Sequence, residues 1–206
     1  MSIDTNMPTL GFLELSTVRL LLADIVTPLS APQATLGLFA GLRRREAENF
    51  DCEDVCVDSA RRRIAGILVT GRRGLVRYVS ASSALHGWLS PYLGMRGPIV
   101  WPTSLAHRLR TWARRHGLRL THSTLRRTYA TCRLASTRKF ELVALEMGWN
   151  LSLWSAHMVL LPALADADAY FDLTPEACGR PGWAQEVAAW RSAGCPGATR
   201  PRQGEV

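Results

Sequence analysis

The spacing of apolar residues along the chain predicts a mainly helical protein. Residues 13–25 and 121–131 carry apolar side chains at helical intervals, and in the second segment Leu125, Tyr129 and Cys132 form a stripe that we expect to be buried. Glycines that follow such patterns mark helix ends. Further helices are predicted over residues 33–40, 81–93, 104–116 and 139–147, with a short one after Gly41.

Two β-prone runs separated by a turn predict a hairpin. Residues 64–70 and 75–80 favour extended structure, and the turn between them starts at Gly71 and ends at Gly74. Residues 55–57 form one more extended run. The expected fold is therefore mainly α with a small antiparallel β-sheet, an α+β protein.

The last third of the chain has a less regular pattern. Residues 151–164 are apolar and we expect them to pack, whereas residues 165–175 are expected to turn the chain away from the core. Glycine, proline and arginine become frequent after that point, and only residues 183–190 look helical. We therefore predict one domain over residues 1–178 and a loosely held tail over residues 179–206.

Charge narrows the classes of partner. The 206 residues include 25 basic and 17 acidic ones, for a net charge of +8, which favours nucleic acid. Lys139 is the only lysine, so nearly all the positive charge belongs to arginine. Five irregularly spaced cysteines fit neither a disulfide framework nor a zinc site, and we expect reduced thiols in a cytoplasmic, nucleoid-associated protein. No apolar stretch has the length of a membrane span.

Two predicted helices carry candidate anion-binding residues. His122 and Arg126 are four residues apart near the start of one helix, where a phosphate is favoured. The basic helix before it could lie along a DNA backbone. Solvated charge is the alternative interpretation of both helices, and the sequence leaves it open. The arginines of the basic helix are Arg108, Arg110, Arg114 and Arg115.

Four short motifs follow one another along the chain. They are Gly41-Leu42-Arg43-x-x-Glu46, Arg77-x-Val79 in the hairpin, Leu125-Arg126-Arg127-Thr128-Tyr129-Ala130-Thr131, and Met147-Gly148-Trp149. Each motif is weak by itself, but the ordered set is fairly specific. In this order and spacing the set resembles the catalytic domain of the tyrosine recombinases, the phage-integrase family, over roughly residues 13–175.

The resemblance implies phosphoryl transfer on double-stranded DNA without a cofactor or metal. Enzymes of the family attack a phosphodiester with a tyrosine, while two arginines bind its non-bridging oxygens. By position these arginines would be Arg43 and Arg126, with Glu46 holding Arg43 in place. His122 and Trp149 would complete the catalytic set. The further residues expected to contact DNA are Arg73, Arg77, Arg108, Arg114 and Arg115.

Some positions depart from the family pattern. Where the hairpin lysine should protonate the leaving oxygen, this chain offers Arg72 or Arg73, and arginine is a poor general acid because it keeps its proton. Ser123 occupies the usual imidazole position, with His122 one residue further away. Trp149 stands in place of a histidine, as in some family members, and its indole N–H can still donate a hydrogen bond.

The largest departure is at the nucleophile. Met158 stands where the tyrosine is expected, and a thioether cannot form the phosphoester link. Tyr170 lies too far along the chain, and Tyr129 falls on the apolar stripe. Losing a covalent nucleophile costs on the order of a million-fold in rate. The family's N-terminal DNA-clamping domain has no room before Leu13, so we expect modest, salt-sensitive affinity.

Three hypotheses remain open from the sequence. The first is a recombinase-like DNA-binding domain, associated with DNA recombination or integration, that lacks autonomous strand cleavage. The second is an active recombinase subunit that works with a partner recombinase or an atypical nucleophile. The third is a non-catalytic protein-interaction module, in which the C-terminal region docks on another subunit or on a second copy and the arginines are solvated.

Overall fold

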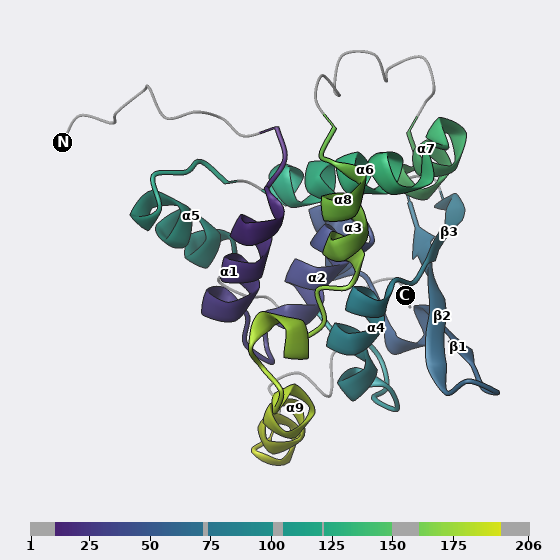
Figure 1. Cartoon of the computed structure of the whole chain (residues 1–206). Helices are drawn as coiled ribbons and strands as arrows, with labels where there is room; N and C mark the ends of the chain where they lie inside the picture. Colours follow the sequence, from purple (N-terminus) through teal and green to yellow (C-terminus); the bar gives the residue numbers. More distant parts are fainter. Residues whose placement is uncertain (1–10, 72–73, 101–104, 121, 150–160, 195–206) are drawn as a thin grey trace.

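The protein is a helical body with a small sheet along one side (Figure 1). This architecture confirms the predicted fold class, because helices dominate and the three strands pair antiparallel. No helix in the described ranges is both long and apolar enough to cross a membrane. The computed structural model describes residues 11–71, 74–100, 105–120, 122–149 and 161–194, without the side chains of Ile25 and His122.

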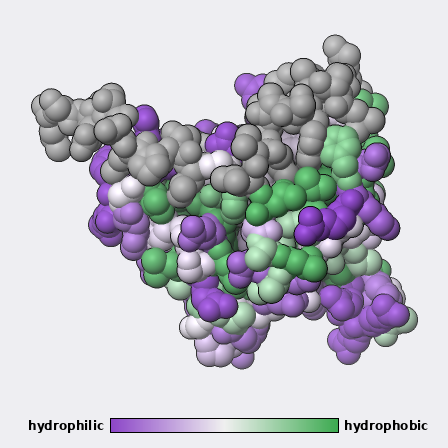
Figure 2. Space-filling view, turned by 45° about the horizontal axis from the view of Figure 1, so that its top comes forward, coloured by the Kyte–Doolittle hydropathy of each residue, from purple (hydrophilic) through white to green (hydrophobic). Residues whose placement is uncertain are grey.

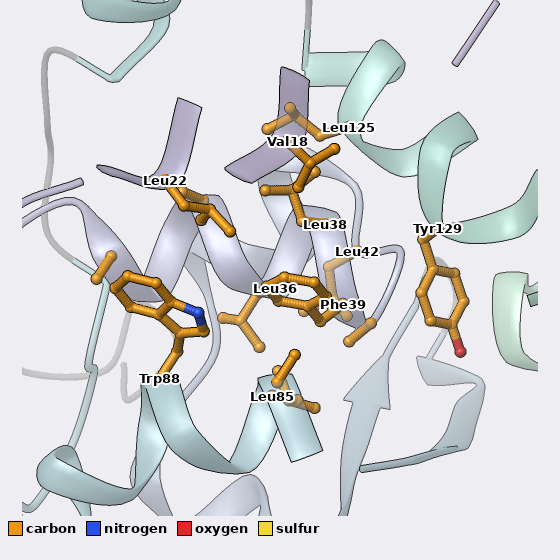
Figure 3. Close-up of a cluster of buried hydrophobic side chains, with 14 of the residues drawn as sticks. Val18, Leu22, Leu36, Leu38, Phe39, Leu42, Leu85, Trp88, Leu125 and Tyr129 are labelled. Carbon is orange, nitrogen blue, oxygen red and sulfur yellow. The ribbon is translucent and has the colours of Figure 1, made fainter. Parts of the chain in front are cut away.

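Helix α2 (Ala31–Phe39) lies at the centre of the body, and all nine of its residues are buried. It starts two residues earlier than predicted because Pro32 falls in its first turn, where the missing N–H costs nothing. Helices α1, α4 and α6 surround it, and Figure 3 shows apolar side chains from all four helices meeting around Phe39. The bounds of the neighbours are α1 Leu15–Ile25, α4 Ser83–Leu89 and α6 His122–Thr137.

The stripe predicted on α6 is buried as expected. Leu125, Tyr129 and Cys132 are 0%, 1% and 4% exposed. The helix continues to Thr137, six residues beyond the predicted segment of 121–131, and Thr137 donates a hydrogen bond back to the carbonyl of Arg133. The longer helix brings Arg133 into the core region, which becomes important for the site below.

The sheet contains β1 (Val55–Asp58), β2 (Arg63–Thr70) and β3 (Val76–Ser80) in that order, which confirms the predicted hairpin. In the β2–β3 register Ile67 lies opposite Val79, and both are buried against the helices. Leu68, next along β2, points to the outer face and is exposed, as the alternation of a half-covered sheet requires.

The structure corrects the prediction that residues 165–175 leave the core. They form most of α8 (Leu164–Phe171), which packs on α6 and buries Tyr170. The tail prediction is also wrong as far as residue 192, because α9 (Trp183–Ser192) buries Trp183 against α4. The alternating alanine and aspartate of residues 165–169 gave no sign of the packing of α8, which depends on Tyr170 and Phe171 at the end of the helix.

The other predicted segments that the structure describes have the predicted type of secondary structure, although some of their ends differ. The predicted helix over residues 81–93 ends at Leu89 and continues as a 3₁₀ turn containing Pro91. The predicted packing of residues 151–164 and the end of the tail beyond residue 194 fall largely outside the described residues. The remaining helices are α3 Arg44–Glu48, α5 Leu105–Arg115 and α7 Phe140–Met147, and the other 3₁₀ turns are Cys52–Asp54 and Glu176–Cys178.

Candidate functional site

A buried carboxylate, Glu46, is the centre of the candidate site. It lies in the first turn of α3, and its Oε2 accepts a hydrogen bond from the backbone N–H of Arg43 at 2.7 Å. The Arg43 guanidinium also reaches back to Oε1 at 2.8 Å, so the ion pair that the three-residue spacing predicts is present. Both contacts follow from the turn at Gly41, which directs the chain into α3 with a φ of 63°.

Arg77 approaches the same carboxylate from the sheet. Its Nη1 and Nη2 donate to Oε1 and Oε2 of Glu46 at 3.0 and 2.7 Å, which is a bidentate pair. Its Nε donates to the carbonyl of Glu146 at 2.7 Å, and its side chain is only 11% exposed. Strand β3 therefore contributes a positioning group, and the sequence-based assignment of Arg77 to DNA contact does not match this internal placement.

Arg126 is the third arginine around Glu46. It comes from α6, its Nη1 lies 3.6 Å from Glu46 Oε2, and it is 9% exposed. Its two terminal nitrogens donate to the carbonyls of Gly41 and Met147. The guanidinium carbon also lies 5.7 Å from the centre of the Trp149 ring, within the range of a cation–π contact. We call Glu46, Arg43, Arg77 and Arg126 the Glu46 cluster.

The end of α7 provides a second set of acceptors for the cluster. The carbonyl oxygens of residues 146–148 accept, in order, from Arg77, Arg126 and Arg43, the last at 3.4 Å. This end of a helix carries partial negative charge, which suits cations. Gly148 closes the helix with a left-handed φ of 58°, so the last carbonyls turn towards the cluster.

The cluster has a net positive charge. Burial by itself raises the pKa of Glu46, but hydrogen bonds from Arg77 and Arg43 and the charges of Arg77 and Arg126 lower it to about 2. Burial and the charge of Arg43 lower the pKa of Arg126 to about 9, so it stays protonated at neutral pH. Three positive charges and one negative charge therefore give a net charge of +2. Arg43 is the accessible member, with 40% of its side chain exposed.

Comparison of the sequence with models of known protein families and with curated proteins found no match. Solved structures do match. The integrase from mycobacterium phage Brujita superimposes with a TM-score of 0.56 at 16% identity, covering 90% of this chain and 65% of the integrase. The XerH site-specific recombinase bound to its difH substrate gives 0.52 at 15% identity in a pre-cleavage complex, over 84% of this chain and 52% of XerH.

A post-cleavage complex of XerH with palindromic difH gives a TM-score of 0.50 at 16% identity, over 94% of this chain and 56% of XerH. The fold is that of a tyrosine recombinase catalytic domain. This chain spans less than two thirds of the length of each of these solved recombinase and integrase chains.

The recombinase fold brings together some of the predicted site residues and leaves others apart. Arg43, Arg126, Glu46 and Trp149 converge from three segments, namely the start of α3, α6 and the end of α7. His122 is the first residue of α6, but its side chain lies outside the described part of the chain. The predicted positions Arg72, Arg73 and Met158 also lie outside the described residues.

The basic helix α5 is separate from the cluster and packs on α1. Arg108 donates to the hydroxyl of Thr27 at 3.2 Å, and this hydrogen bond holds the Arg108 side chain against the protein surface. Arg114 and Arg115, in the last turn, are exposed. Among the predicted DNA contacts on the recombinase fold, these two have the most accessible side chains that the structure describes.

The four tyrosines of the chain all lie in the described ranges, and none points its hydroxyl freely at the cluster. Tyr92, Tyr129 and Tyr170 are each 1% exposed, and their hydroxyls donate to Pro28 O, Glu146 Oε2 and Leu38 O, respectively. Tyr78 is exposed on β3, but it follows Arg77 directly and so occupies the opposite face of the sheet. The three buried tyrosine hydroxyls are therefore engaged inside the core, and that of Tyr78 donates to Ala65 O on the outer face of the sheet.

Sequence reasoning missed a second buried carboxylate, Glu146, which is 2% exposed. Arg133 from α6 binds it through Nε and Nη2 at 2.9 and 2.8 Å, and Tyr129 donates its hydroxyl at 2.8 Å. This network fixes α7 against α6 and so determines the position of the α7 carbonyls that accept hydrogen bonds from the Glu46 cluster. The available signal was a glutamate near the end of an otherwise apolar run, since a buried carboxylate needs charged partners.

Proposed function

We propose that this chain binds backbone phosphates of double-stranded DNA through the Glu46 cluster and lacks autonomous strand cleavage. Its role would be in DNA recombination or integration, as a recombinase-like subunit in the cytoplasm. The observation that carries this proposal is the convergence of Arg43 and Arg126 on one carboxylate, with a net charge of +2.

The charge of the cluster fits a phosphodiester. A phosphodiester carries one negative charge, and more charge gathers on its non-bridging oxygens as a nucleophile attacks. Guanidinium forks match those oxygens in geometry, and their positions are already fixed by Glu46 and by the carbonyls of α7. Arg126 uses two of its five N–H groups on carbonyls, so donors remain for an anion.

Helix α5 supplies a second basic surface that supports DNA as the partner. A cavity of about 390 Å³ beside it is lined by Arg108, Arg115, His107 and His116, with Asp24 as the acidic residue of its wall. Positive charge spread over two separate surfaces is expected of a protein that follows a polyanion rather than one that binds a small anion.

The placement of the tyrosines favours a second candidate for catalysis, a subunit that receives a tyrosine from a partner recombinase. A second copy of this chain could not supply one, because its own tyrosines are buried or lie away from the cluster. The cluster would then position the phosphate for the partner's nucleophile.

Salt-dependent DNA binding tests the proposed function. We expect Arg43→Ala to reduce the slope of log affinity against log salt by about one, because one phosphate contact is lost. The matched control is Arg44→Ala, since Arg44 is an adjacent exposed arginine that pairs with Glu48 at 2.6 Å and lies outside the cluster. Equal slopes for the two variants and the wild type would support the interaction module instead.

A trapping assay tests the absence of cleavage. A library of nicked duplexes that trap a covalent intermediate should give no protein–DNA adduct on a denaturing gel with this chain alone. An adduct formed alone would refute the proposed lack of cleavage. An adduct formed only when a partner recombinase with an intact tyrosine is added would identify the second candidate.

A further inference from the structure

Another basic surface, separate from that of α5, lies at the opposite end of β2 from the Glu46 cluster. Gly71, just after β2, is adjacent to the cluster, where a Cβ would lie 3.5 Å from Arg77 Nη1. At the other end, Arg61 and Arg62 lie in the turn between β1 and β2, and Arg63 is the first residue of β2. A strand of this length separates the two places by about 25 Å. Figure 2 shows a strongly hydrophilic projection where Figure 1 places this turn.

A cavity of about 520 Å³ opens between this turn, α4 and α9. Ser83, Ser90 and Thr174 line it together with the three arginines. Hydroxyl and guanidinium groups both donate hydrogen bonds to phosphate oxygens, and phosphate sites commonly combine the two. The size of the cavity suits a phosphate ester rather than a single water molecule or a metal ion.

The positive charge of this wall is largely unneutralised. Arg61 approaches Asp58 only at 3.8 Å, with 78% of its side chain exposed. Arg62 and Arg63 have no carboxylate within ion-pair distance in the part of the chain that the structure describes. Glu176 is the acidic residue of the wall, so the cavity remains net positive.

His86 adds a donor of fixed direction to the same wall. Its Nδ1 accepts a hydrogen bond from the backbone N–H of Ile64 at 3.2 Å, so a neutral ring carries its proton on Nε2. Burial and the charge of Arg63 lower the pKa of His86, which keeps the ring neutral at physiological pH. The strand itself therefore selects the tautomer.

We propose that this cavity is a second phosphate-binding site that takes a backbone phosphate of DNA at a distance from the Glu46 cluster. The indole in its wall, that of Trp183, is 1% exposed and offers no face on which a base could stack, which favours a backbone phosphate over a nucleotide. The choice of DNA rests on the proposed function, whereas the phosphate chemistry does not.

Phosphate binding is tested by titrating inorganic phosphate and following the imidazole signals of His86 by NMR, assigned with His86→Gln. We expect a saturable shift that is lost in Arg62→Ala/Arg63→Ala. The control is Arg138→Ala/Lys139→Ala, which removes the same charge from an exposed site outside the cavity, and Arg138 shares the left-handed backbone of Arg62, with φ of 55° and 51°. No shift in the wild type, or equal loss in both double variants, would overturn the proposal.

DNA is distinguished from a small phosphate by the salt dependence of duplex binding. Arg62→Ala/Arg63→Ala should lower the slope of log affinity against log salt by about two, and the control pair should leave it unchanged. A phosphate shift at His86 with an unchanged slope would overturn the DNA assignment and leave a site for small phosphate esters. Arg43→Ala should not alter the His86 shift. The proposal for this cavity and the proposal for the Glu46 cluster can therefore be refuted independently of each other.

Discussion

Glu46 and Arg77 form a bidentate ion pair in which both side chains are almost entirely buried, with exposures of 7% and 11%. Because Glu46 belongs to α3 and Arg77 to β3, the pair joins the sheet to the helix that carries Arg43. The position of the accessible arginine therefore depends on a contact between two elements that are distant in the sequence.

Glu46→Gln tests how strongly this contact holds the fold. Removing one partner of a buried ion pair typically costs about 3 kcal/mol or more, and here three guanidiniums would lose their shared carboxylate. We expect a loss of that size in the free energy of unfolding, measured by urea denaturation. Glu48→Gln, which removes the surface partner of Arg44, should cost less than about 1 kcal/mol. Equal losses would contradict this.

Stability should fall in acid as Glu46 becomes protonated. Its pKa is lowered from 4.5 to about 2 in the folded protein, so the ionised carboxylate stabilises the fold above about pH 4.5, and this contribution disappears as the pH falls towards 2. We expect about 3 kcal/mol to be lost over that interval. Urea unfolding at a series of pH values should show a shallower decline for Glu46→Gln than for the wild type, and parallel curves would rule this out.

Gly41→Ala should be far more harmful than Gly74→Ala. Both glycines have left-handed backbones, with φ of 63° and 72°, so alanine costs about 1 kcal/mol at either position. At position 41 the new Cβ would also lie 2.6 Å from both Met147 Sδ and Tyr129 Cδ1, whereas nothing lies within 4 Å at position 74. Thermal denaturation of the two variants checks this, and similar melting temperatures would refute the close packing.

Tyr170→Phe tests the docking of α8. The Tyr170 hydroxyl donates to the carbonyl of Leu38, and losing it leaves a buried acceptor unpaired, at a cost of about 1–2 kcal/mol. Tyr78→Phe removes a hydroxyl that donates to Ala65 O at the exposed surface, where water can replace it, and should cost less than about 0.5 kcal/mol. If Tyr170→Phe were as mild as Tyr78→Phe under urea denaturation, the hydroxyl would not be buried as described.

Local pattern was enough to predict much of the fold and part of the site. The stripe of Leu125 and Tyr129, the hairpin, and the pairing of Arg43 with Glu46 depend on residues that are close in sequence. Helical spacing and turn chemistry determine such contacts without knowledge of the rest of the molecule.

Contacts between distant elements were not predictable in the same way. Val76-Arg77-Tyr78 reads as an ordinary strand, and only the packing of α7 on β3 shows that Arg77 is on the covered face. Arg133 meets Glu146 because α6 extends further than its apolar pattern suggests. These partners follow from how helices cross, which a single sequence does not specify.

The end of α7 holds the arginines through main-chain oxygen atoms, and this affects how the protein can diverge. A carbonyl is the same whichever side chain is attached, so these hydrogen bonds require only that α7 keeps its position, which the Glu146 carboxylate secures, and its end, which the left-handed Gly148 secures. An insertion or deletion there would give every guanidinium a different oxygen. The spacing of this segment therefore matters as much to the placement of the arginines as the identities of Glu146 and Gly148 do.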